Sequence, residues 1–127
     1  MALPPSSLRR VLAIIAGVFG VATLFAGVRV LLGADPGYVV YLPLLAFNTA
    51  MGAAYLSTGV RGWFDARKGR RGAATILVLN ALMLAFIVWL YLAQPGTVAR
   101  ESVAAMGFRT AAWLVLWGGF SWAARRA

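Results

Sequence analysis

Residues 61–72 read RGWFDARKGRRG and divide the chain into two apolar halves. Five of the twelve Lys and Arg residues of the chain lie in this short segment. Each apolar half is long enough for two membrane-spanning helices, because one crossing of a bilayer needs about 20 mostly apolar residues. We therefore expect the segment to be a basic cytoplasmic loop between two helical hairpins.

The composition of the whole chain indicates an integral membrane protein. The chain has 127 residues, of which 62% are hydrophobic, and its mean hydropathy is +0.83. A soluble domain of this composition would have to expose a very large apolar surface. We predict an all-α membrane protein, a single domain over residues 1–127, with four antiparallel transmembrane helices at approximately residues 8–32, 38–63, 73–93 and 98–124.

The basic residues are distributed unevenly between the two ends of these helices. Besides the segment 61–72, the end that holds both termini carries Arg9, Arg10, Arg125 and Arg126. The opposite end carries Arg29, Arg100 and Arg109. An excess of Lys and Arg marks the cytoplasmic side of a membrane protein. Both termini are therefore predicted to be cytoplasmic, and the net charge of +9 requires no nucleic-acid partner.

The basic segment also predicts a contact with lipid. Each Lys or Arg near a bilayer surface attracts anionic head groups by about 1 kcal/mol. We expect the head groups of the inner leaflet to contact Arg67, Lys68, Arg70 and Arg71. Eleven Arg residues against one Lys, with many Ala and Gly residues, indicate a GC-rich bacterial genome. The expected location is the bacterial cytoplasmic membrane, which the chain crosses several times.

Several classes of chemistry are excluded by what the sequence lacks. The chain has no Cys and no His, so thiol chemistry, imidazole-bound metal and a histidine proton shuttle are ruled out. No nucleophile and base can be paired from the remaining residues, and we expect neither an enzyme nor a cofactor. The three carboxylates, Asp35, Asp65 and Glu101, lie in loops or at helix ends, so none is expected in the middle of the membrane. This placement argues against proton-coupled exchange of cations.

Arg109 is the strongest candidate for a functional residue, because a charged side chain within a span is rare and costs roughly 3 kcal/mol to insert. One interpretation is that it reaches outward and pairs with Glu101 or Asp35, while Arg29 extends to the outer interface in the same way. The other is that its guanidinium binds an anion or a polar group at the mouth of a cavity.

Two amides and three phenols form the second candidate site. Asn48 and Asn80 lie within neighbouring spans, and we expect them to hydrogen-bond directly or through a water molecule. They are either a polar contact between helices or, with three tyrosines, the lining of a polar cavity. These tyrosines are Tyr41, Tyr55 and Tyr91.

Small residues recur at helical spacing in the spans, and in the first span they include Gly17 and Gly20. Such ridges allow helices to pack closely, within one chain or between chains. The leading hypothesis is a small, oligomeric membrane protein whose polar intramembrane site is a transport pathway or a binding site for a small polar or anionic species. The alternative is an accessory or assembly subunit that docks onto a larger membrane complex.

Overall fold

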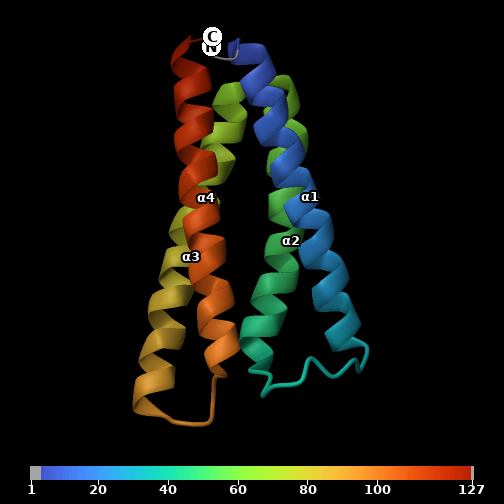
Figure 1. Cartoon of the computed structure of the whole chain (residues 1–127), viewed down its shortest axis with the longest axis vertical. Coiled ribbons are helices and arrows are strands. Elements are labelled where there is room, and N and C mark those ends of the chain that lie inside the picture. The colour runs from blue at the N-terminus through green and yellow to red at the C-terminus, as the bar shows by residue number, and fades with distance from the viewer. Residues whose placement is uncertain (1–3, 127) are drawn as a thin grey trace.

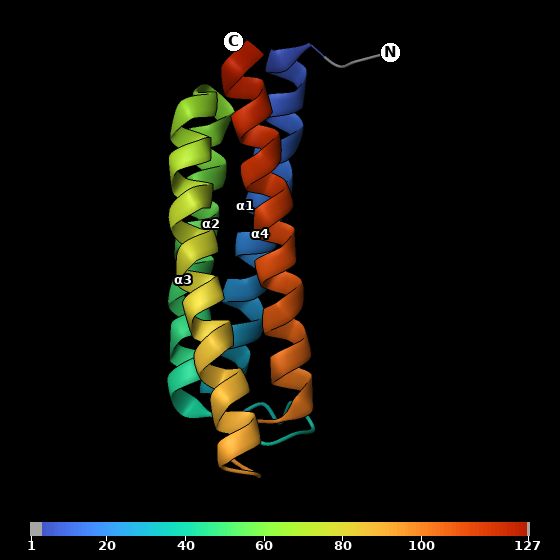
Figure 2. The same cartoon turned by 90° about the vertical axis from the view of Figure 1, so that its left-hand side faces the viewer.

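The computed structural model describes residues 4–126, and its regular structure is entirely helical. The four helices are α1 (Pro5–Leu31), α2 (Leu42–Phe64), α3 (Ala66–Ala93) and α4 (Arg100–Arg126). They form an elongated bundle in which the two chain ends and the connection between α2 and α3 lie at one end (Figure 1). Figure 2 shows the same bundle from the side. The all-α prediction is confirmed.

Three of these helices are long and apolar enough to cross a membrane, namely α1, α3 and α4. The exception, α2, has 23 residues and is about 34 Å long at 1.5 Å per residue. Its length is sufficient for a bilayer core of about 30 Å. It carries several polar residues along its length, including Asn48, Thr49 and Thr58.

The prediction that residues 61–72 form a loop was wrong. α2 continues to Phe64 and α3 begins at Ala66, so only Asp65 separates them. Asp65 has an extended backbone, with φ −152° and ψ 117°, and its carboxylate accepts a hydrogen bond of 2.9 Å from the backbone N–H of Arg67. The basic residues continue the helix because Arg, Lys and Ala are all strong helix formers.

The glycines of this segment permit close packing rather than a turn. A Cβ atom on Gly69 would lie 2.6 Å from the ring of Phe120, and one on Gly72 would lie 2.5 Å from the Thr58 hydroxyl. The chain therefore turns at Asp65 and stays tightly packed on both sides of it.

The opposite end of the bundle differs less from the sequence prediction. α2 begins at Leu42 rather than near residue 38, because residues 38–41 do not continue the helix and Pro43 occupies its first turn. The turn before it is stabilised by the Asp35 carboxylate, which accepts a hydrogen bond of 2.8 Å from the N–H of Gly37. Gly37 has φ +87°, and Gly96, in the turn between α3 and α4, has φ +90°. Glycine adopts this left-handed conformation without a steric penalty.

The most extensive helix contact joins α1 and α2. A Cβ atom on Gly20 would lie 2.5 Å from the backbone nitrogen of Leu56 and 2.9 Å from the carbonyl oxygen of Gly52. The backbones of the two helices therefore touch, which only glycine permits at this distance. The small residues of α1 are a packing surface within one chain. α3 packs closely on α4, whereas α1 and α4 make the weakest contact around the bundle.

Candidate functional site

The centre of the bundle contains a buried polar pair, Tyr55 from α2 and Asn80 from α3. Both residues are completely inaccessible to solvent. The Asn80 Nδ2 atom donates a hydrogen bond of 3.0 Å to the Tyr55 hydroxyl, which donates one of 3.2 Å to Asn80 Oδ1. The sequence suggested that Asn80 would bond to Asn48, but its partner is this tyrosine. Each member satisfies the other, which is how polar groups are tolerated in an apolar interior.

Aromatic side chains from the other two helices surround this pair. The ring of Trp113 in α4 stacks on Tyr55 with a centroid distance of 4.8 Å, and Phe19 in α1 meets Tyr55 edge-on at 5.3 Å. We call Phe19, Tyr55, Asn80 and Trp113 the central cluster. All four helices contribute to it, and each member lies near the middle of its helix. The middle of the bundle is therefore filled.

Arg109 lies outside this cluster, in a groove between α1 and α4 of about 570 Å³. Figure 1 shows the two helices diverging away from the end that carries the termini. We call this cavity the α1–α4 groove. Its walls are mostly apolar, and its lining residues are Ile14, Ile15, Val18, Phe19, Ala22, Thr23, Ala26, Ala105, Phe108 and Arg109.

The guanidinium of Arg109 has no carboxylate partner among residues 4–126. The ion pair found within these residues joins Arg100 to Glu101 at 4.0 Å, and both of those side chains are largely exposed. Glu101 is eight residues before Arg109, about 12 Å along the helix, which is too far for direct pairing. Asp35 bonds within its own turn. Arg109 is half-buried.

Asn48 occupies a third place, nearer the end of the bundle opposite the termini. With Tyr41 and Ser102 it lines a cavity of about 60 Å³, and its Oδ1 atom is buried without a hydrogen-bond partner in the described residues. Asn48 therefore lines a small cavity with Tyr41 and Ser102 and makes no hydrogen bond to Asn80.

The six residues predicted at the two candidate sites, Arg109 included, are not brought together in the structure. Tyr55 and Asn80 are in the central cluster, whereas Asn48 and Tyr41 line the small cavity. Tyr91 is exposed on α3. The remaining member, Arg109, lines the α1–α4 groove. Of the residues predicted at the outer side, Arg29 stacks over Phe25 at 5.6 Å and is exposed.

Sequence reasoning missed three residues at these places. Thr23 lies on the small-residue face of α1, and this position predicts that the side chain is buried. It does not predict that the side chain lines a groove. Trp113 was not among the predicted site residues, yet it is fully buried beside Tyr55. Nothing in the local sequence marks Ser102 as a neighbour of Asn48.

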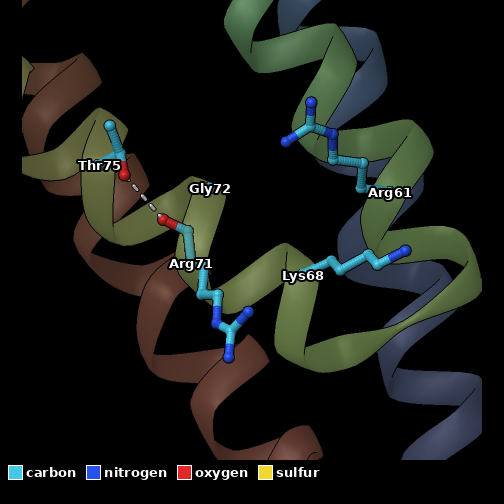
Figure 3. Close-up of a pocket in the computed structure, with 5 residues that line it drawn as sticks. All are labelled: Arg61, Lys68, Arg71, Gly72 and Thr75. Atoms are coloured by element: carbon cyan, nitrogen blue, oxygen red, sulfur yellow. Dashed lines mark hydrogen bonds between the residues drawn. The ribbon is translucent and has the colours of Figure 1, made fainter.

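The basic residues gather around the corner between α2 and α3. Arg67, Lys68 and Arg71 are exposed, and Arg70 is half-buried. Lys68 and Arg71 line a cavity of about 540 Å³ together with Arg61, as Figure 3 shows. We call this cavity the basic pocket; it is also lined by Gly72 and Thr75.

Comparison of the chain with known protein families, with curated proteins and with solved structures finds no match.

Proposed function

We propose that the protein is a non-enzymatic, multi-pass membrane protein that binds an amphiphilic anion from within the bilayer. The ligand has an apolar body and one anionic group, as a fatty acid has. Its binding site is the α1–α4 groove. In this proposal all four helices cross the membrane antiparallel to their chain neighbours, and the basic end, with both termini, faces the bacterial cytoplasm.

The position of Arg109 is the observation that carries this proposal. Its half-buried guanidinium lines an apolar groove and has no carboxylate partner in residues 4–126. A cation in such a place is costly unless an anion or water compensates it. Arg109 is nine residues from the start of α4, about 13 Å along the helix, so its Cα lies well inside the span.

The size and lining of the groove support an amphiphile rather than a small ion. A volume of about 570 Å³ is within the range of ordinary ligand sites, roughly 300–1,000 Å³. Its walls, from Ile14 to Ala26 on α1, suit an apolar chain, and the hydroxyl of Thr23 can donate a second hydrogen bond. A pathway through a single copy receives no support, because the central cluster fills the bundle.

Binding of a fluorescent anionic fatty-acid analogue to the purified protein tests the proposal. We expect Arg109→Leu to weaken binding by about tenfold to a hundredfold, the usual value of a hydrogen-bonded charge. Filling the groove with Ala22→Leu should also weaken binding, although the arginine is retained. Both effects should appear in the dissociation constant at fixed detergent concentration.

The matched control is Arg29→Leu, which removes another arginine near the same end of the bundle. This side chain is exposed over Phe25 and lies outside the groove, so binding should be unchanged. The methyl ester of the same analogue should bind weakly. Equal affinity for the ester and the acid, or an unaffected Arg109→Leu variant, would contradict the proposal.

An accessory subunit remains the second candidate function, favoured by unpartnered small residues on the outside of the bundle. Ala46, Ala50 and Ala53 on α2 are exposed, as are Ala81 and Ala85 on α3. Such surfaces let a neighbouring helix approach closely. Purification of the chain alone in detergent discriminates between the two functions. A stable protein supports the binding function, whereas a chain that unfolds unless a membrane partner is co-purified supports the subunit.

A further inference from the structure

We propose that the basic pocket binds a ligand that carries two phosphate groups. This site is independent of the α1–α4 groove, because its lining residues come from the last turn of α2 and the first turns of α3. Its walls contain three cationic side chains, those of Arg61, Lys68 and Arg71. Carboxylates are missing from the lining.

The helical corner explains why these side chains share one pocket. Lys68, Arg71 and Thr75 are separated by three and four residues, so they lie on one face of α3. Arg61 approaches from α2 across the corner, as Figure 3 shows. A flexible loop over residues 61–72 would not fix this arrangement, whereas the continuous helices on both sides of Asp65 do.

The nearest acidic residue in the chain is already engaged. The carboxylate of Asp65 accepts the backbone N–H of Arg67 as the cap of α3, and Asp65 does not line the pocket. Other arginines at this end of the bundle stack on tryptophans: Arg10 over Trp63 at 5.4 Å, and Arg126 over Trp122 at 5.0 Å. Within residues 4–126 no carboxylate pairs with the three cations of the pocket. These cations therefore repel one another, and a polyanion relieves that repulsion.

The arrangement of the charges indicates two anionic groups rather than one. The charged ends of Arg61, Lys68 and Arg71 are directed differently around the pocket, so they do not converge on a single phosphate (Figure 3). The hydroxyl of Thr75 donates a hydrogen bond of 3.0 Å to the carbonyl oxygen of Arg71. Thr75 therefore lines the pocket without offering a free donor to a ligand. A pocket of about 540 Å³ accommodates two phosphates joined by a short bridge.

The position of the pocket favours a lipid as the source of the phosphates. The apolar part of α3 begins at Ala73, immediately after the basic residues, so the pocket lies at the level where head groups meet the hydrocarbon. Basic pockets between membrane helices recognise multiply charged head groups by this placement. A soluble diphosphate has the same chemistry and is the other source to be tested.

Native mass spectrometry of the full chain in nanodiscs tests the proposal. The probes are diphosphatidylglycerol and phosphatidylglycerol, compared at equal total charge in a phosphatidylcholine background. We expect the wild type to prefer diphosphatidylglycerol, and the double variant Lys68→Gln/Arg71→Gln to lose about 30-fold in affinity for it, as expected for two surface cations.

The control variant is Arg67→Gln/Arg70→Gln, which removes two charges from the same helix without touching the pocket. Because Arg67 and Arg70 are also expected to contact anionic head groups, it should weaken the binding of both lipids alike and retain the preference for diphosphatidylglycerol. Because the exchanged side chains are exposed or half-buried, both variants should keep the helical circular dichroism of the wild type. An equal loss of the preference for diphosphatidylglycerol in the two variants, or equal binding of the two lipids by the wild type, would overturn the proposal.

Pyrophosphate and orthophosphate distinguish the two sources of phosphate. In neutral nanodiscs, tight binding of pyrophosphate that is lost in Lys68→Gln/Arg71→Gln supports the pocket and assigns it to a soluble diphosphate. Retention of diphosphatidylglycerol in the presence of excess pyrophosphate supports the lipid. Displacement of that lipid by orthophosphate as readily as by pyrophosphate counts against a site for two phosphates.

Discussion

The two flanks of α1 pack in opposite ways. Towards α2, Gly20 and Gly27 leave no room even for a methyl group, and the helices touch through backbone atoms. Towards α4, the aromatic ring of Phe19 reaches Trp113 at 6.1 Å and Phe108 at 6.1 Å, and a groove remains beside these contacts. One flank is closed by glycine, and the other is held apart by large side chains.

The difference shows where a membrane bundle gains stability and where it leaves space for a ligand. Without a hydrophobic effect between helices, close backbone packing supplies much of their attraction. The closed flank therefore stabilises the fold. The open flank contains Arg109, which in our proposal binds the anionic group of a ligand. Three sets of substitutions probe this division, in order of decreasing expected effect.

The largest effect is expected when the closed flank is forced open by Gly20→Ala. The new Cβ would lie 2.5 Å from the backbone nitrogen of Leu56, and backbone atoms cannot move aside without separating the helices. We expect a loss of about 1–3 kcal/mol in the free energy of unfolding, the usual cost of overpacking. Unfolding by sodium dodecyl sulfate, followed by circular dichroism in mixed micelles, measures it.

Gly17→Ala is the matched control on the same helix. No atom lies within 4 Å of a Cβ at this position, so the substitution should be neutral or slightly stabilising. Both changes raise helix propensity equally. Equal stability of the two variants would show that the contact between α1 and α2 is not as close as described.

An intermediate effect is expected in the central cluster, which joins both flanks. Tyr55→Phe or Asn80→Leu alone leaves one buried polar partner without a hydrogen bond, at a cost of about 1–2 kcal/mol, as for polar contacts between membrane helices. The double variant replaces both partners by apolar groups of similar shape and should recover part of that loss. The double-mutant cycle should give a coupling of about 1 kcal/mol. Additive losses would mean that the pair does not interact.

The smallest effect is expected from Asn48→Leu, the same exchange at the other intramembrane asparagine. Its carbonyl oxygen is buried and has no protein partner in residues 4–126, so the substitution removes no hydrogen bond of that atom. The free energy of unfolding should change by less than about 0.5 kcal/mol, as at sites outside the packed core. A loss as large as that of Asn80→Leu would indicate that the two asparagines share one network.

Most of the candidate site could not be predicted from the sequence, because the partners of each polar residue lie on other helices. Asn80 was recognised as a polar residue within a span, but its depth alone pointed to Asn48 rather than Tyr55. Arg109 was recognised because charge is rare within a span. The groove that it lines depends on how far α1 and α4 diverge, which their own residues do not encode.

Sequence alone was enough to establish that the chain is helical, that at least three of its helices are apolar enough to cross a membrane, and that its basic residues gather at one end. Each of these properties depends on composition and spacing along one helix. The packing of the helices had to be seen to learn that α1 is closed against α2 and open towards α4, and that the basic segment forms a helical corner with a pocket. Those features follow from the distances between helices, which are set by all the side chains of an interface together.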